Sequence, residues 1–178
     1  MIERDPAPTT RAATLDDAQF IAAHIRAQDA TELAAMGADA QAVVAGFHAS
    51  LWSDVATAHG QPVCIYGVSP SQVDSRIGLP WLIGTPAMEA LGRHFIRGCA
   101  PVVQRMLDAF PVLVNVTHCG NTVAQRWLRW LDFQFAPSPA GCQFLGFWKA
   151  QPQDAALALG WLVRCGVVDS EESNVHRN

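Results

Sequence analysis

The sequence predicts an α/β protein in which helices pack on a mixed sheet. Segments with strand-like composition alternate with segments whose apolar residues recur at helical spacing. In particular, the β-type run 111–120 is followed directly by the amphipathic segment 121–133. Half of the 178 residues are hydrophobic and 16% are charged. That composition is typical of one globular domain with a sizeable core.

The N-terminal part predicts one strand followed by three helices. Residues 1–10, rich in Pro and Thr, are expected to form a leader. The first strand ends at Thr14, whose hydroxyl is placed to cap a helix, and Asp17 lies three residues further on, near the positive helix end. The predicted helices cover 14–27, 30–36 and 40–52.

The middle of the chain changes to β-type periodicity. Residues 53–58 and 62–68 predict a hairpin that turns at 59–61, and a polar, turn-rich segment precedes a short apolar strand at 79–84. Helical spacing returns at 86–109, where Pro101 is expected to kink the helix or to start a second one.

The C-terminal part predicts strand 112–118, helix 121–132, strands 134–137 and 142–148, and an apolar helix within 154–168. Either this last helix docks on the domain's own sheet, or it binds a partner. Residues 170–178 are expected to fray. The predicted organisation is a leader at 1–10, a domain at 11–149, and a C-terminal helix with a tail at 150–178.

Charge and composition exclude several classes of function. The formal net charge of −4 gives no electrostatic reason to expect a nucleic-acid partner, although arginines between Arg93 and Arg129 leave room for a modest anion site or for solvated helix faces. Without a signal-peptide pattern or a run of about 20 apolar residues, we expect a soluble protein with no membrane partner.

The five cysteines lie in apolar runs and predict buried, reduced thiols rather than disulfides. Neither their spacing nor that of the histidines suggests a metal site.

The segment 121–133 predicts a capped amphipathic helix. Asn121 is a good N-cap, and Gly120 permits a tight passage from the preceding strand. An ideal helix would place six residues on one buried arc (Val123, Ala124, Trp127, Leu128, Trp130, Leu131) and turn Gln125, Arg126 and Arg129 away. In strand 112–118, alternation leaves Asn115 and Thr117 on the face opposite the apolar core, where they could line a cleft.

The chain resembles the GCN5-related N-acetyltransferase (GNAT) superfamily. The resemblance lies in Arg11-Ala-Ala-Thr-Leu-Asp-Asp17, and in Asn121, Ala124 and the ending Leu131-Asp132-Phe133, which matches the usual Asn, Ala and Leu-Gly-Phe of the superfamily's fourth helix. It implies a mixed sheet with splayed central strands, here 79–84 and 112–118, and with helices on both faces. It also implies an acyl-CoA cofactor, acetyl-CoA, lying between those strands.

In that superfamily, backbone N–H groups at the start of the third helix bind the cofactor pyrophosphate. By position, this turn falls between Thr85 and Arg93. The resemblance therefore implies five cofactor-binding candidates: Thr85, Gly92, Arg93, Asn115 and Asn121.

The chain departs from the superfamily pattern at its catalytic positions. The usual Gln/Arg-x-x-Gly-x-Gly/Ala loop is reduced here to Gly92, and Glu89 brings negative charge to the expected phosphate site. Many members place a tyrosine seven residues after the Asn as a general acid, but this chain has Leu128 there, and strand 79–84 lacks a glutamate base. His118 and Glu89 are the remaining acid–base candidates, although each is as readily a structural or solvated residue.

A narrower resemblance is to the divergent acetyltransferase-like internal virion protein A (Gp13-like) family of T7-like phages. It spans about residues 11–148 and lies mainly in Leu113-x-Asn115, Gly120-Asn121-Thr122 and the helix that contains Phe95 and Met106-Leu107. It implies a structural or assembly role with other virion proteins, in the host cytoplasm or in the virion, without efficient acetyl transfer and with either no cofactor or acetyl-CoA. The alternatives are an acetyl-CoA-dependent N-acyltransferase and a module that binds acyl-CoA without chemistry.

Overall fold

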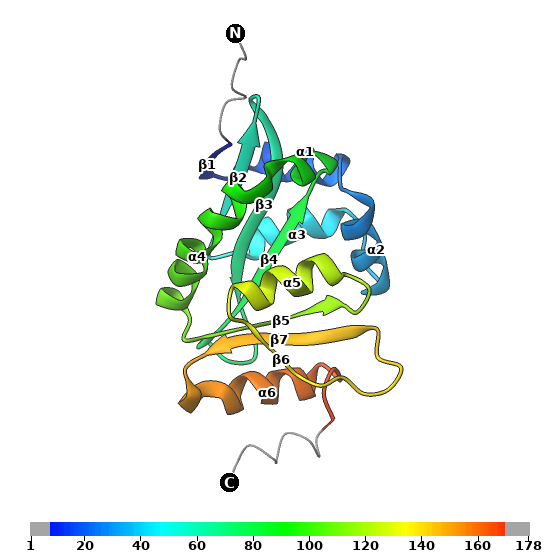
Figure 1. Ribbon diagram of the computed structural model, residues 1–178, viewed down its shortest axis with the longest axis vertical. Coiled ribbons are helices and arrows are strands. Elements are labelled where there is room, and N and C mark those ends of the chain that lie inside the picture. The colour runs from blue at the N-terminus through cyan, green and yellow to red at the C-terminus, as the bar shows by residue number, and fades with distance from the viewer. Residues whose placement is uncertain (1–7, 170–178) are drawn as a thin grey trace. The chain divides into compact units, whose positions relative to one another are not determined.

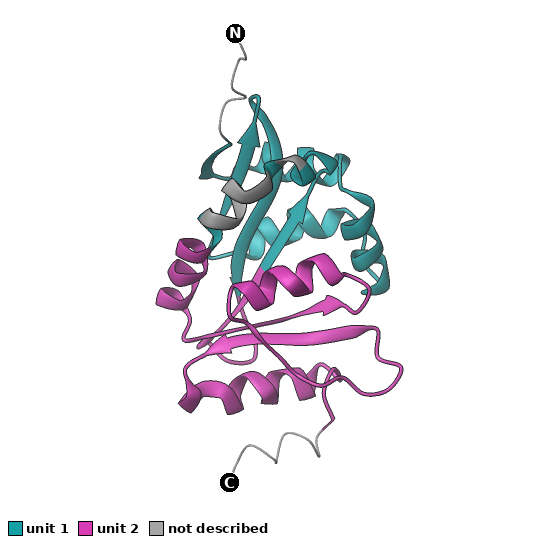
Figure 2. Ribbon diagram, viewed as in Figure 1, with its two compact units in different colours: residues 1–69, 81–99 teal, residues 70–80, 100–178 magenta. Residues whose placement is uncertain are grey.

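The computed structural model describes residues 8–169, apart from the side chains of residues 90 and 92–97. The expected leader residues 1–7 and the tail 170–178 lie outside the described residues. The chain forms two compact units, residues 1–69 with 81–99 and residues 70–80 with 100–178 (Figure 2). The boundaries between them fall within strand β4 (Ile77–Gly84) and, one residue before Pro101, within helix α4 (Gly92–Ala109).

The first unit starts with a strand and three helices. These are β1 (Thr9–Ala12), α1 (Leu15–Ala23), α2 (Ala27–Ala35) and α3 (Gln41–Ala49). The antiparallel hairpin of β2 (Trp52–Ala58) and β3 (Gln61–Pro70) follows, and the strand order is β1-β2-β3-β4 (Figure 1). The 3₁₀ helix η1 (Pro86–Leu91) comes after β4 and leads into α4.

Helices cover both faces of β3 in this unit. On the Ile65 face, α1 and α3 bury Ala18, Ile21 and Val43. Cys64, the next residue along the strand, points to the opposite face. There burial raises the pKa of the Cys64 thiol to about 12, with a smaller contribution from the nearby Cys99 of α4.

The second unit contains the remaining strands and helices. They are β5 (Val112–His118), α5 (Thr122–Trp130), β6 (Gln134–Phe135), β7 (Phe144–Ala150), the 3₁₀ helix η2 (Pro152–Asp154) and α6 (Ala155–Arg164). The strand order is β4-β5-β7-β6, in which β4 and β5 are parallel and the other pairs are antiparallel. The predicted mixed α/β architecture is therefore confirmed.

The sheet of the second unit also carries helical structure on both faces. Leu162 of α6 packs so closely on Gly146 of β7 that an added Cβ would lie 2.7 Å from it. On the other face, the Phe147 ring meets Phe133, just after α5, at 5.4 Å, and Lys149 Nζ donates to Leu131 O at 2.7 Å. The last helix thus docks on its own sheet (Figure 1), as the first of its two interpretations predicted.

Several predicted boundaries shift. Strand β1 includes Thr9, which pairs with Thr57, so this strand begins inside the expected leader. The three predicted helices are present, but α1 ends at Ala23 instead of about Ala27, and α2 begins at Ala27 instead of Ala30. Strand β3 continues to Pro70, into the segment expected to turn, because its pairing with β2 extends to Val68.

The predicted buried arc of α5 was wrong at two of its six positions. Val123 and Trp130 are 65% and 54% exposed, whereas Gln125 is only 8% exposed. Gln125 can lie inward because its Nε2 donates to the carbonyl of Cys119 at 2.8 Å, so the buried amide is not left without a bond. The helix is rotated so that Asn121, Gln125 and Leu128 share the buried face.

The cysteine prediction holds in part. All five thiols are free, but Cys119 and Cys165 are exposed because both lie at the ends of elements rather than inside them. Within residues 8–169, the structure contains no helix with the length and apolar character needed to cross a membrane.

Candidate functional site

The end of β4 is fixed by a buried ion pair from the start of α2. Asp29 Oδ2 accepts a hydrogen bond from Gly84 N at 2.8 Å and one from Arg26 Nε at 2.7 Å. The backbone N–H of Arg26 donates to Gly84 O at 2.9 Å. Both backbone groups of Gly84 are thus satisfied, and the chain leaves β4 in one defined direction.

Gly84 is required at this position because η1 approaches it closely. A Cβ added to Gly84 would lie 2.6 Å from Met88 Sδ, well inside van der Waals contact. Met88 N donates to Thr85 O at 3.0 Å and closes the first turn of η1. The turn 84–88 is therefore compact and apolar on its inner side.

Thr85, a predicted cofactor-binding residue, uses its donors within the protein. Its backbone N–H and its Oγ1 both donate to Val63 O, at 2.8 Å and 3.1 Å. The side chain is buried, so Thr85 links the start of the turn to β3. This geometry favours a structural role.

The electrostatics of the turn centre on Arg26 and Asp29. Burial lowers the pKa of Arg26, but the hydrogen bond and the charge of Asp29 outweigh it, helped by Cys64 and Glu89, so the pKa is raised overall. Asp29 is 4% exposed and Glu89, on η1, is exposed. The Arg26 guanidinium therefore stays charged beside the buried carboxylate of Asp29 and the exposed carboxylate of Glu89.

The remaining predicted residues of this turn lie at the start of α4. Gly92 is the first residue of that helix, whereas the helical spacing predicted a helix from residue 86. The side chain of Arg93 lies outside the described residues, and the contribution of Gly92 and Arg93 to cofactor binding stays a prediction.

In the second unit, Asn115 marks the place where β4 and β5 stop pairing. The parallel ladder contains only Ile77↔Val112 and Gly78↔Leu113. Beyond it, Asn115 Nδ2 donates to Pro80 O at 2.9 Å, and Asn115 Oδ1 accepts from Val116 N at 2.9 Å. The Asn115 side chain thus takes the place of a backbone hydrogen bond between the two strands. The pairing of β4 and β5 ends here, as the predicted splay requires.

The turn from β5 into α5 engages His118 and Asn121 in local hydrogen bonds. Gly120 N donates to His118 Nδ1 at 3.1 Å, and the ring meets Phe144 edge to face. Asn121 Oδ1 accepts from Ala124 N at 3.1 Å, which makes Asn121 the predicted N-cap of α5. Both residues therefore have structural tasks, whatever further role they take.

No tyrosine occupies the expected general-acid position. Leu128 is 7% exposed and belongs to the core face of α5, and the one tyrosine of the chain, Tyr66, lies in β3 of the first unit. The acid–base candidates Glu89 and His118 belong to different units.

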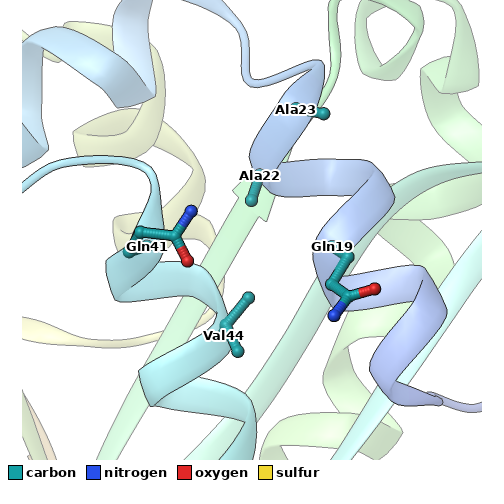
Figure 3. Close-up of a pocket in the computed structure, with 5 residues that line it drawn as sticks. All are labelled: Gln19, Ala22, Ala23, Gln41 and Val44. Atoms are coloured by element: carbon teal, nitrogen blue, oxygen red, sulfur yellow. The ribbon is translucent and has the colours of Figure 1, made fainter.

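A separate cavity of about 340 Å³ lies between α1 and α3 (Figure 3). The amides of Gln19, from α1, and Gln41, from α3, stand on its two sides, and Ala22, Ala23 and Val44 complete its lining. None of these five side chains titrates, so the cavity has no acid–base group of its own. Among the described residues, no cluster of three or more His, Cys, Asp or Glu side chains could hold a metal ion.

Arg26 and Asp29 were missed by the sequence analysis. Their i, i+3 spacing was a signal for an ion pair, but the predicted helices 14–27 and 30–36 did not place the two residues on one helix. Nothing in the sequence indicated that the pair would bind the end of a strand 55 residues away.

The chain is similar to solved acetyltransferase structures. The GNAT domain of an S. lividans protein aligns at a TM-score of 0.61 with 10% identity, over 82% of this chain and 95% of its own. The ribosomal-protein-S5-alanine acetyltransferase of Vibrio fischeri aligns at 0.59 with 14% identity, over 83% and 94%. A putative acetyltransferase of Salmonella typhimurium, determined with acetyl-CoA, aligns at 0.52 with 15% identity, over 80% and 91%.

No model of a known protein family matches the sequence, and no curated protein matches it either. The comparisons thus give no support to the narrower resemblance to phage virion proteins. With identities of 10–15%, the structural similarity shows the fold alone. The chain has the fold of the GCN5-related N-acetyltransferases.

Proposed function

We propose that this protein binds an acyl-CoA, with acetyl-CoA as the first choice, and acts as an N-acyltransferase. The observation that carries the proposal is the short parallel ladder of β4 and β5, which ends at Gly78 and Leu113. Past that point, the Asn115 side chain joins β5 to Pro80. Strands that stop pairing leave backbone groups that a ligand can bind, and a putative acetyltransferase with this fold was determined with acetyl-CoA.

The residues present fit the cofactor in part. The ordered turn 84–88 and the neighbouring Arg26 suit an anionic group, whereas Glu89 opposes one. When bound, acetyl-CoA supplies an acetyl thioester to an amine. The protein's own contribution would be to bind and orient, because Leu128, at the usual general-acid position, cannot donate a proton.

Titration calorimetry with acetyl-CoA tests the proposal. We expect saturable binding below about 1 mM, and a ligand concentration 100-fold above Kd should stabilise the fold by about 2.7 kcal/mol in a thermal shift. Absence of both signals would contradict the proposal.

A pair of glycine variants localises the binding. In Gly84→Ala the new methyl group meets Met88, whereas in Gly98→Ala, on α4, it meets nothing within 4 Å. We expect Gly84→Ala to weaken acetyl-CoA binding by about 10-fold, because a displaced turn also moves Arg26, whose backbone N–H donates to Gly84 O. Gly98→Ala should bind as the unaltered protein does. Equal affinity in both variants would place the cofactor elsewhere.

A cofactor-binding role without transfer is the second candidate, and the burial of Leu128 at the general-acid position favours it. Release of free thiol from acetyl-CoA in the presence of amine acceptors separates the two candidates. Binding without amine-dependent thiol release would favour the second candidate. The assembly role in a phage virion remains a prediction from short motifs.

A further inference from the structure

We propose that Arg26 is the cation that binds the cofactor phosphate at the turn 84–91, and that Glu89 competes with the phosphate for it. The inference rests on the proposed function, since the phosphate is that of the acyl-CoA. The inference goes further than the proposed function in two respects. It names Arg26, at the start of a different helix, as the residue that binds the phosphate, and it names Glu89, on η1, as the group that competes with the phosphate.

The backbone places Arg26 next to the turn. Its N–H donates to Gly84 O at 2.9 Å, and Gly84 immediately precedes Thr85 and η1. Asp29 closes the arrangement, because the oxygen that accepts from Arg26 Nε also accepts from Gly84 N. These hydrogen bonds therefore hold Arg26 beside the turn.

Asp29 orients the Arg26 guanidinium and leaves some of its N–H donors available. Asp29 engages Nε only, and among the described residues no hydrogen bond reaches Nη1 or Nη2. The side chain is 20% exposed, so part of it borders solvent. A planar fork with free N–H groups is well suited to two phosphate oxygens.

The turn itself has no other cation among its described side chains. Met88 packs on Gly84, and the ionisable side chain described in η1 is the carboxylate of Glu89. Glu89 follows the turn on η1, five residues after Gly84, and its charge helps to raise the pKa of Arg26. A phosphate bound to Arg26 would be repelled by this carboxylate and would compete with it for the charge of Arg26.

Three single substitutions test this pairing. Arg26→Gln removes the cation, Glu89→Gln removes the competitor, and Arg76→Gln is the control, since Arg76 pairs with Asp74 at 2.8 Å in the other unit. Each protein is titrated with acetyl-CoA, and with S-acetylpantetheine, which lacks every phosphate, at low and at high salt.

We expect Arg26→Gln to weaken acetyl-CoA binding by about 10-fold and Glu89→Gln to tighten it by about 3-fold, both effects shrinking at high salt. Affinity for S-acetylpantetheine should not change in any variant, and Arg76→Gln should behave as the unaltered protein. A merely structural Arg26 would instead weaken both ligands alike.

Two outcomes overturn the inference while the proposed function survives: acetyl-CoA binding unchanged in Arg26→Gln, or equal losses for the two ligands. Because Arg26→Gln leaves Asp29 buried without its partner and could lower stability, Glu89→Gln on the exposed side of η1 keeps the test decisive. Failure of Glu89→Gln to tighten binding would refute the competition. If the unaltered protein binds no acetyl-CoA, the proposed function fails as well.

Discussion

Single residues set the ends of the elements that carry the site. Thr14 and Asp17 form a reciprocal capping box at the start of α1. Arg11 adds two hydrogen bonds to the same carboxylate, at 2.6 Å and 2.8 Å. The cap was predicted from Thr14 and its spacing to Asp17, whereas the contribution of Arg11 became visible only once β1 was placed beside α1.

The capping box should make stability depend on pH in acid. The hydrogen bond from Arg11, with further ones from Thr14, lowers the pKa of Asp17 from 3.8 to about 2. Because the folded pKa is below the ordinary value, the stabilisation is complete above pH 3.8 and is lost as pH falls through about 2. Asp17→Asn should cost about 1 kcal/mol in urea unfolding at pH 6, and the difference from the unaltered protein should nearly vanish at pH 2. A difference that stays constant with pH would contradict this account.

Asp132 holds a backbone conformation that favours glycine. Its φ is +60°, at the position where the superfamily motif of this helix has Gly. Its ion pair with Lys149 spans 3.8 Å and is largely exposed, so it offers little compensation. The sequence identified the departure from the motif but not its conformational cost.

Replacing this residue should raise stability. Asp132→Gly should increase the free energy of unfolding by about 0.5–1 kcal/mol, because glycine adopts positive φ without a steric penalty. Asp132→Ala is the matched control and should be neutral or destabilising, since alanine gains no such freedom. Chemical denaturation measures both, and a gain in the alanine variant would show that charge, not conformation, limits this position.

At the scale of elements, α6 is tied to β7 by a close helix–strand contact. Gly146 has no room for a side chain against Leu162, whereas Gly160, on α6 itself, has no atom within 4 Å of its missing Cβ. Alternation and helical spacing predicted the helix and its docking. They did not single out Gly146, because a close approach depends on the final packing.

The two glycines should respond to the same substitution with opposite signs. Gly146→Ala should lower stability by about 1–3 kcal/mol through overpacking. Gly160→Ala should raise it by about 0.5–1 kcal/mol, because glycine weakens a helix interior. Thermal unfolding of the two variants provides the comparison, and a stabilising Gly146→Ala would mean that α6 does not rest on β7.

The α5 helix shows where pattern reading fails. Its hydrophobic residues predicted a buried arc that included Val123 and Trp130, yet both are exposed and Gln125 is buried. Hydrophobicity alone favoured the wrong face, because the amide of Gln125 finds a carbonyl partner at Cys119. A hydrogen bond of this kind depends on the conformation of the turn before the helix. The spacing of hydrophobic residues carries no information about that conformation.

For the whole molecule, the order of elements was predictable and the candidate site was not. Strand 112–118 was located to the residue, since its apolar run is bounded by Pro111 and Gly120. The predicted cofactor residues Thr85, Asn115 and Asn121 each form a hydrogen bond to the backbone of their own unit. Arg26 and Asp29 escaped prediction because their importance comes from a long-range bond to Gly84.

Hydrogen–deuterium exchange with and without acetyl-CoA tests the central claim most directly. If the cofactor binds at the end of β4, protection should increase in peptides that cover residues 81–91, and peptides of α1 and α3 around the Gln19–Gln41 cavity should be unchanged. Saturating acetyl-CoA that leaves residues 81–91 unprotected, or that protects α1 and α3 instead, would contradict the account.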